Sequence, residues 1–242
     1  FEHLYRTKGC QLQIGGQDQW GNITSGLELI RKMNGADSVA YGVTVPLVTK
    51  SDGTKFGKSE SGAVWLDPKK TSPYQFYQFW INTSDQDVVK RLKQFTFLSK
   101  DETEQVIAEW EQAPHQRLAQ KVLAKEITTL VHGEAAYEQA LRVTEALFSG
   151  KVQDLTLEEI EMGFEGIPSV ELSEDTNIID ALVMVKAASS KREAREFIQN
   201  GAVLINGVQE KSLEYTITKD NALGGKYTIV RRGKKNYYLL KH

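Results

Sequence analysis

The sequence predicts an α/β part with a parallel sheet, then an all-α domain, then a small α+β module. Two apolar runs flank an amphipathic helical pattern near the start, and helix-capping patterns fill the middle of the chain. Short apolar runs with a hairpin turn follow near the end. We expect the α/β part at 1–69, the helical domain at 70–150, an acidic linker at 151–176 and the α+β module at 177–242.

The α/β part is predicted from a strand–helix–strand pattern. Residues 11–14 alternate polar and apolar side chains and run into Gly15-Gly16, which is typical of a strand that enters a tight turn. A helical pattern begins near Asn22, and Val43–Val48 is expected to be a second, buried strand. Such a unit has parallel strands, whose ligands bind beyond the strands' carboxyl ends. The glycine turn and the loop at Ser51–Gly62 are therefore expected to face one site.

Helical signals fill the middle of the chain. Ser72–Ile81 is rich in aromatic residues, Ser99 and Glu102 form a capping box, and a further helix is expected over 134–148. Between them lies an apolar stripe at helical spacing, formed by Leu118, Val122, Ile127, Leu130 and Val131.

The acidic stretch from 151 to 176 carries one short helix capped by Thr156, and we expect the rest to let the last module move. That module begins with helices over 178–185 and 190–198. Asn206-Gly207 is the dipeptide preferred in a type I′ hairpin turn. Strands are expected at 202–205, 208–209, 227–230 and 237–240.

Composition limits the function classes. Hydrophobic residues make up 40% and charged residues 26% of the chain, as in ordinary globular proteins. No apolar run approaches the roughly 20 residues of a membrane span, so no membrane partner is expected. Cys10 is the only cysteine, which favours a reducing, cytoplasmic setting. The four histidines are scattered, so we expect no metal site.

The loop at Ser51–Gly62 reads SDGTKFGKSESG and sets Lys55 and Lys58 three positions apart between glycines. A lysine ammonium is a mobile point charge that suits phosphate. Two of them on a flexible loop suit a clamp that tightens as charge develops on a leaving pyrophosphate. The loop's own residues also permit a simpler reading, a hairpin tip that carries lysines for solubility.

The glycine turn reads Gly15-Gly16-Gln17-Asp18-Gln19. Its two glycines allow a ligand to approach the backbone closely. Asp18 is suited to accept hydrogen bonds from ribose hydroxyls, and Gln19 is suited to hold a polar substrate group. An ordinary turn, in which Asp18 or Asn22 caps the following helix, is the alternative.

The last module is basic, since residues 176–242 hold 12 Lys and Arg against 6 Asp and Glu. This excess predicts a polyanion partner whose affinity falls steeply with salt. The candidate polyanion-binding residues are Lys186, Lys191, Arg192, Arg195, Arg231, Arg232, Lys234 and Lys235. Tyr237 and Tyr238 are candidates for stacking on a base, but strand residues with at least one in the core are the favoured interpretation.

Together these segments resemble a known family. Gly15–Ile23, Val45–Lys50 and Lys55–Ser59 resemble, in this order, the second half of the catalytic domain of bacterial tyrosyl-tRNA synthetases. Lys55–Ser59 is similar to the KMSKS loop of class I synthetases, with Phe56 in place of Met and Gly57 in place of Ser. Both lysines and the final serine match that pattern.

The resemblance extends over essentially the whole chain. The region that begins at Ser72–Ile81 is similar to the family's helical anticodon-binding domain, and Ser190–Gly207 resembles an S4 RNA-binding motif. The implied architecture is the second part of a Rossmann-like class I catalytic domain, then an all-α anticodon-binding domain, then an S4-like α+β domain.

The resemblance also implies an activity. The family uses ATP with Mg²⁺, and no other cofactor, to convert L-tyrosine to tyrosyl-adenylate, and then transfers the tyrosyl group to the 3′ end of tRNA(Tyr). The matching positions are Gln13 and Gln19 for tyrosine, Gly16, Asp18, Leu47, Val48 and Lys58 for ATP or adenylate, and Lys55, Lys58 and Ser59 for catalysis.

The family's HIGH motif, its recognition of the tyrosine phenol and most of its dimer interface come from elements that precede this region. We therefore expect the chain to be part of a longer, homodimeric enzyme and to be inactive in tyrosine activation alone. Two alternatives remain. A tryptophan-specific enzyme is disfavoured by the S4-like tail. A non-catalytic RNA-binding protein derived from a synthetase is disfavoured by the two lysines and by Gly16, Asp18 and Gln19.

Overall fold

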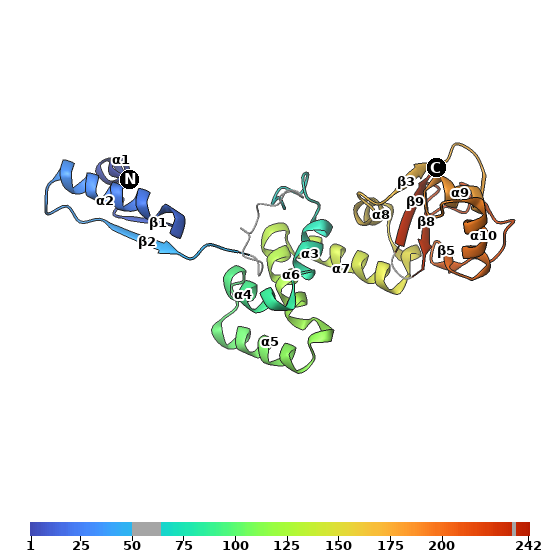
Figure 1. Cartoon of the computed structure of the whole chain (residues 1–242), viewed down its shortest axis with the longest axis horizontal. Helices are drawn as coiled ribbons and strands as arrows, with labels where there is room; N and C mark the ends of the chain where they lie inside the picture. Colours follow the sequence, from blue (N-terminus) through green and yellow to red (C-terminus); the bar gives the residue numbers. More distant parts are fainter. Residues whose placement is uncertain (50–63, 234–235) are drawn as a thin grey trace. The chain divides into compact units, whose positions relative to one another are not determined.

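The computed structural model describes residues 1–49, 64–233 and 236–242. The chain divides into two compact units, Phe1–Ala63 and Val64–His242 (Figure 1). In the part of the chain that is described, no helix has the length and apolar character that a membrane span requires.

The first unit is a strand–helix–strand arrangement. Its elements are α1 (Glu2–Lys8), β1 (Leu12–Gly16), the 3₁₀ helix η1 (Gln17–Gln19), α2 (Trp20–Asn34) and β2 (Tyr41–Val45). The two strands pair in parallel, as the sequence predicts, with Ile14 opposite Val43. Helix α2 packs on one face of this sheet through buried Ile23. Close packing needs Gly42, since a Cβ there would lie 2.5 Å from Cγ2 of Ile23.

The other face of this two-stranded sheet is open. Its apolar side chains are between 45% and 63% exposed and belong to Leu12, Ile14, Tyr41, Val43 and Val45. The prediction of a buried strand over Val43–Val48 is therefore wrong in both position and burial. Strand β2 ends before Pro46, which has no N–H to donate to a ladder, and alternate side chains of β2 face solvent.

The second unit begins with a helical part. Its elements are α3 (Pro73–Ile81), α4 (Asp85–Phe95), α5 (Lys100–Gln112), the 3₁₀ helix η2 (Pro114–Gln116), α6 (Leu118–His132) and α7 (Glu134–Ser149). Helix α6 contacts α3, α4, α5 and α7. Ser72, Ser84 and Ser99 cap α3, α4 and α5 through their side-chain oxygens. The capping box of Ser99 and Glu102 is confirmed.

The buried face of α6 differs from the predicted stripe. Its core residues are Ala119, Leu123, Ala124 and Ile127, whereas Leu130 is 60% exposed. Fully buried Gln120 lies on the same face, and its Nε2 donates to Asp85 Oδ1 over 2.6 Å. The predicted stripe was right at Ile127 but misplaced elsewhere, because the small residues Ala119 and Ala124 and the polar Gln120 share the buried face with Leu123 and Ile127.

The rest of the second unit surrounds a five-stranded sheet. Its elements are η3 (Val152–Asp154, 3₁₀), α8 (Leu157–Gly163), β3 (Ser169–Glu171), β4 (Thr176–Asn177), α9 (Ile178–Met184), α10 (Lys191–Gln199), β5 (Val203–Ile205), β6 (Val208–Gln209), β7 (Thr216–Ile217), β8 (Tyr227–Arg232) and β9 (Asn236–Lys241). The strand order is β3-β9-β8-β5-β6. Asn206 and Gly207 both have positive φ, 48° and 86°, as the predicted type I′ turn requires.

This sheet is covered on both faces, and Figure 1 shows α8 and α10 on either side of it. Because strand residues alternate between faces, Val230 and Leu240 pack with α9 and α10, while Ile229 and Leu239 pack with Ile160 of α8.

The segment from 151 to 176 belongs to this sheet and its cover. Val152, Ile160 and Phe164 are core residues, and β3 pairs in parallel with β9. The prediction of an acidic linker is therefore wrong, although the short helix capped by Thr156 is confirmed. The acidic composition of this segment suggested a linker because most of its acidic residues face solvent. A few apolar residues spaced between them enter the core.

Candidate functional site

The glycine turn in the first unit brings together three of the predicted nucleotide-binding residues. Strand β1 ends at Gly16, and the chain turns through η1 into α2. A Cβ on Gly16 would lie 2.8 Å from Asp18 Oδ1 and 3.0 Å from Leu47 Cδ2. The bare backbone at Gly16 is thus flanked by one carboxylate and one apolar side chain, at the carboxyl ends of two parallel strands.

Helix α2 begins at Trp20, and its N-cap residue is Gln19, whose side chain accepts no hydrogen bond from a backbone N–H of the first turn. Neither Asp18 nor Asn22 holds the N-cap position, so the capping alternative is wrong. Asn22 instead donates to Gln19, with 3.0 Å between Nδ2 and Oε1.

The predicted tyrosine-binding glutamines lie on the helix-facing side of β1. Gln13 and Gly15 share a face of the strand, and a Cβ on Gly15 would lie 3.2 Å from the Cβ of Gln19. The Oε1 atom of Gln13 is buried and accepts no hydrogen bond from any residue that the structure describes. A buried amide oxygen without a donor is costly, which makes Gln13 a candidate to receive one from a ligand.

Leu47 and Val48 follow β2 and are half-buried, beyond the carboxyl end of that strand. The predicted catalytic residues Lys55, Lys58 and Ser59 lie outside the described residues. Among the residues that are described, no group of three or more His, Cys, Asp or Glu is arranged to hold a metal ion.

A basic face in the second unit holds most of the predicted RNA-binding residues. Lys186 follows α9 with a positive φ of 60°, and it is exposed. Lys191, Arg192 and Arg195 are exposed on α10, whose N-terminus is capped by Ser190. Lys191 also bonds to α9, with 2.6 Å between its Nζ and Oδ1 of Asp180.

Glu193 stabilises the start of α10 within this basic face. Its carboxylate accepts hydrogen bonds from the hydroxyl and the backbone N–H of Ser189, at 2.6 and 2.5 Å. These bonds hold the pKa of Glu193 below its ordinary value, and the nearby Arg232 guanidinium acts in the same direction. The acid is therefore ionised and fixed, and it leaves the neighbouring cations of α10 exposed.

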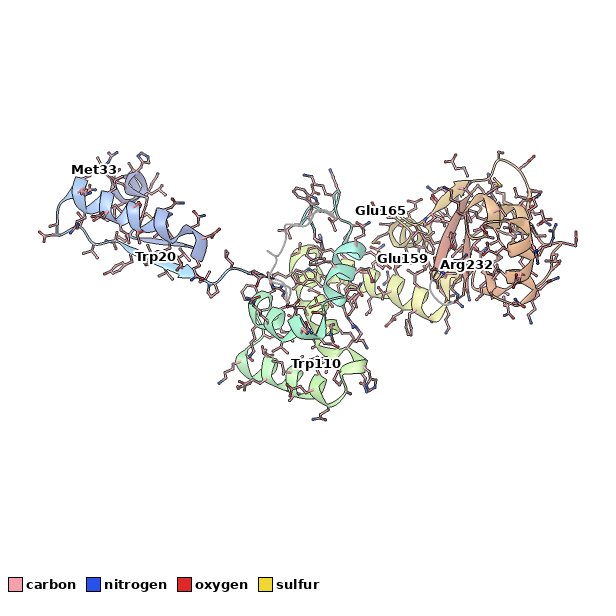
Figure 2. All side chains as sticks on the ribbon, in the orientation of Figure 1. Trp20, Met33, Trp110, Glu159, Glu165 and Arg232 are labelled. Atoms are coloured by element: carbon pink, nitrogen blue, oxygen red, sulfur yellow. The ribbon has the colours of Figure 1, made fainter. Side chains whose placement is uncertain are left out.

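Arg231 and Arg232 were both predicted to bind RNA, but they do not lie on the same face of the sheet. Consecutive strand residues point to opposite faces. Arg232 donates to the carbonyl of Ala187 and lies 5.1 Å from the Phe197 ring centre, on the α10 side (Figure 2).

Arg231 points the other way, toward Tyr237, with 3.5 Å between Nη1 and the phenolic oxygen. The same guanidinium would be 2.7 Å from a Cβ on Gly150. Lys234 and Lys235 lie outside the described residues.

The tyrosines of β9 have structural roles. Tyr238 is a core residue, and the hydroxyl of Tyr237 donates to the carbonyl of Leu147 over 2.5 Å. The interpretation that places at least one of them in the core is confirmed.

A groove along the helical part was not anticipated from the sequence. It has a volume of about 990 Å³ and lies against α6, α7 and η3. Arg117, Lys121 and Lys151 contribute cations, and Phe148 contributes a ring that is 93% exposed. These residues are scattered over the sequence, so no local pattern could have shown the groove.

Comparison with known proteins places these features in a family. The sequence profile described as "tRNA synthetases class I (W and Y)" matches residues 1–149. A second profile, described as "Tyrosine--tRNA ligase SYY-like C-terminal domain", matches residues 159–240. The chain therefore belongs to the class I tRNA synthetases of the tryptophan and tyrosine family.

Within this family the similarity is to tyrosine enzymes, which confirms the resemblance stated above. The chain is 58% identical to "Tyrosine--tRNA ligase 1" of Bacillus cereus and 56% identical to "Tyrosine--tRNA ligase" of Geobacillus stearothermophilus. Both alignments cover 100% of this chain and 58% of the relative, so the chain spans little more than half of their length.

Comparison with solved structures also finds a tyrosine enzyme. A C-terminally truncated mitochondrial tyrosyl-tRNA synthetase of Aspergillus nidulans is 33% identical, with a TM-score of 0.50. That match covers 61% of this chain and 41% of the other chain.

Proposed function

We propose that this chain is part of a tyrosine–tRNA ligase, which uses ATP to activate L-tyrosine and transfers it to the 3′ end of tRNA(Tyr). The observation that carries the proposal is the 58% identity over the whole chain to relatives of that name. The tyrosine-type profile over residues 159–240 favours tyrosine over tryptophan as the amino acid.

The geometry of the glycine turn supports a nucleotide site. In the proposal, the ribose of ATP lies against the bare backbone of Gly16 and donates its hydroxyls to Asp18. Leu47 and Val48 provide the apolar surface beside the adenine. Gln13 and Gln19 hold polar groups of tyrosine.

The reaction needs no protein nucleophile. The tyrosine carboxylate oxygen forms a bond to the α-phosphorus, and the bond from that phosphorus to the bridging oxygen breaks, so pyrophosphate leaves with the electron pair. Lys55 and Lys58, with Ser59, stabilise the charge that develops on the leaving group. ATP arrives with Mg²⁺, which binds mainly to phosphate oxygens rather than to a protein cage.

For the RNA, we propose that Lys186, Lys191, Arg192 and Arg195 contact tRNA phosphates, joined by Arg232, Lys234 and Lys235. The exposure of α10 supports this assignment. Arg231, which was predicted with this set, faces α7 and supports the fold instead.

We further propose that the intact enzyme is a cytoplasmic homodimer, in which this chain supplies a catalytic part at 1–69, a helical anticodon-binding domain at 70–150 and an S4-like domain at 177–242. The HIGH motif then lies in the part of the relatives' length that this chain does not span, and the chain alone does not activate tyrosine. A non-catalytic RNA-binding protein is the second candidate, because the basic face would serve it equally well.

ATP–pyrophosphate exchange by the full-length protein, with each amino acid in turn, tests the proposal. We expect exchange with tyrosine only, and an effect of Lys58→Ala of about 10² to 10³ in rate. Lys69→Ala, outside the loop, is the matched control. Exchange with tryptophan would overturn the specificity, and normal exchange by Lys58→Ala would overturn the role of the loop. tRNA binding without any exchange would favour the non-catalytic candidate.

A further inference from the structure

An aspartate lies within the basic face of α10, which consists of Lys186, Lys191, Arg192 and Arg195. Oδ1 of Asp180, in the first turn of α9, lies 2.6 Å from Nζ of Lys191, at the start of α10. The aspartate side chain is 44% exposed and the lysine side chain 61%, so both remain in contact with water. One of the cations assigned to RNA is therefore already paired with a carboxylate of the chain itself.

The position of Lys191 explains why its charge needs an anion. Lys191 is the first residue of α10. The unpaired N–H groups at a helix N-terminus give that end a partial positive charge, which disfavours a cation there. Asp180 lies in the first turn of α9, where the same effect favours a carboxylate. The lysine thus requires a nearby anion, which is Asp180 in the free chain, and an RNA phosphate is the alternative.

Apolar packing already holds α9 and α10 together without this ion pair. Ile178 and Leu182 of α9 are buried in the same apolar cluster as Ala194 and Ile198 of α10. An exposed ion pair contributes little to stability, because water and salt screen both charges and the two side chains lose freedom when they pair. The ion pair is therefore of little value to the fold, and another anion can displace the aspartate at a small cost.

The remaining charges of this face are arranged differently. Among the residues that the structure describes, Arg192 and Arg195 form no ion pair, and both are exposed. The carboxylate of Glu193 accepts hydrogen bonds from Ser189, which hold it away from the lysine. The face thus presents two open guanidinium groups beside one ammonium group that must exchange its partner before it binds a phosphate.

We propose that Asp180 limits the affinity of this face for RNA, because its carboxylate competes with an RNA phosphate for Lys191. A phosphate binds Lys191 only by displacing Asp180, and the displaced carboxylate then repels that phosphate. Phosphate contacts carry no sequence information, so the competition restrains binding of RNA in general. The inference rests on the proposed function, since an internal anion at this place matters only if a polyanion binds.

Binding of unmodified tRNA(Tyr) to the 242-residue chain, measured over a series of salt concentrations, tests the competition. We expect Asp180→Asn to bind about three- to fivefold more tightly at moderate salt. The plot of log affinity against log salt concentration should be steeper by about 0.7 to 0.9, because one more phosphate is neutralised. The matched control is Glu165→Gln, which removes one negative charge at an exposed position beside α8 (Figure 2) and should change the affinity by less than about twofold.

A substitution of the lysine separates direct competition from general repulsion. In the unaltered chain, Lys191→Ala should weaken binding less than Arg192→Ala does, since Lys191 must first leave Asp180. In a chain that already carries Lys191→Ala, Asp180→Asn should tighten binding no more than Glu165→Gln does, because the contested cation is gone. An equal gain from Asp180→Asn with and without Lys191 would overturn the inference and assign the effect to long-range charge.

The outcomes distinguish this inference from the proposed function. Circular dichroism shows whether each variant is folded, and Asp180→Ser is the second variant if Asp180→Asn is not. If the unaltered chain binds no tRNA at any salt concentration, the proposed RNA function fails and the competition fails with it. If the unaltered chain binds tRNA but a folded Asp180 variant binds no more tightly, the competition alone is wrong.

Discussion

The β1-β2 sheet and the five-stranded sheet are built on the same local rules but differ in how many of their faces are covered. In the N-terminal unit, α2 covers one face of β1 and β2, and side chains such as Ile14 and Val43 remain exposed on the other. In the C-terminal module, which comprises residues 152–233 and 236–242, α9 and α10 cover one face of the five-stranded sheet and α8 covers the opposite face. Strand pairing alone therefore does not predict stability, because stabilisation grows with the apolar area removed from water.

The difference has a consequence for the proposed site. A two-stranded sheet is marginal without further packing. Gly16, Asp18 and Leu47 lie at the end of the β1-β2 sheet, which is less buried than the five-stranded sheet. The basic residues of α10 are attached to the sheet that is covered on both faces.

The largest effect should come from removing a covered side chain. Leu240→Ala, at a position with 0% exposure, should lower the free energy of unfolding by about 2 to 5 kcal/mol. Ile14→Ala, at 63% exposure, should change it by about 0.5 kcal/mol or less. Urea titration followed by NMR, which separates signals of the two units, provides the measurement. Equal losses would show that the open face is covered in solution.

The packing of α2 on the covered face of the N-terminal sheet can be tested with single glycine substitutions. Gly42→Ala places a methyl group 2.5 Å from Ile23 and should destabilise this unit by about 1 to 3 kcal/mol. Gly21→Ala in α2, where a Cβ meets nothing within 4 Å, should be neutral or slightly stabilising. The same urea titration reports both variants. A harmless Gly42→Ala would mean that α2 does not pack tightly on β2.

The ionic contact beneath the C-terminal sheet should make its stability depend on pH. Burial raises the pKa of Glu159, but the Thr156 hydrogen bonds and Arg142 outweigh burial and bring the pKa below its ordinary value of 4.5. The stabilisation is therefore complete above about pH 4.5 and is lost as the pH falls through the lowered folded-state pKa.

Glu159→Gln should cost about 1.5 kcal/mol at pH 7 and should flatten the pH dependence in the acid range below the ordinary pKa of 4.5. Urea midpoints measured across this range check both effects. An unchanged slope in the variant would assign the acid sensitivity to other carboxylates.

The smallest loss of stability is expected when either of two capping boxes is removed. Thr156→Ala and Ser99→Ala should each cost about 1 kcal/mol, because each leaves an N-terminal amide of its helix without its cap. Only α8 covers a sheet, so only Thr156→Ala should speed hydrogen exchange of amides in β9. If Ser99→Ala had the same effect on β9, the helical part and the sheet would unfold as one unit.

Much of the local structure could be predicted from the sequence. Ser99, Thr156, Ser190 and the pair Asn206-Gly207 act over three or four residues, and the structure confirms the elements that they begin or connect. The grouping of Gly16 with Asp18 is likewise local, since both lie within one turn.

Contacts between distant segments could not be predicted in this way. Strand β3 is three residues long, and its partner β9 follows some seventy positions later, so no pattern near Ser169 indicates the pairing. The opposite orientations of Arg231 and Arg232 follow from strand periodicity, but only once β8 is known to extend through both residues. The lysine loop lies outside the described residues, and its role remains a proposal.

The position of β9 has a consequence for synthesis of the protein. Strand β9 lies between β3 and β8, and it is the last of these strands to be translated. While it is still within the ribosome, β3 has no strand to pair with and the apolar residues of α8 have an incomplete surface to cover. The module should therefore fold only after β9 has emerged, and until then its unpaired strand edges would be exposed to chaperones and to other nascent chains.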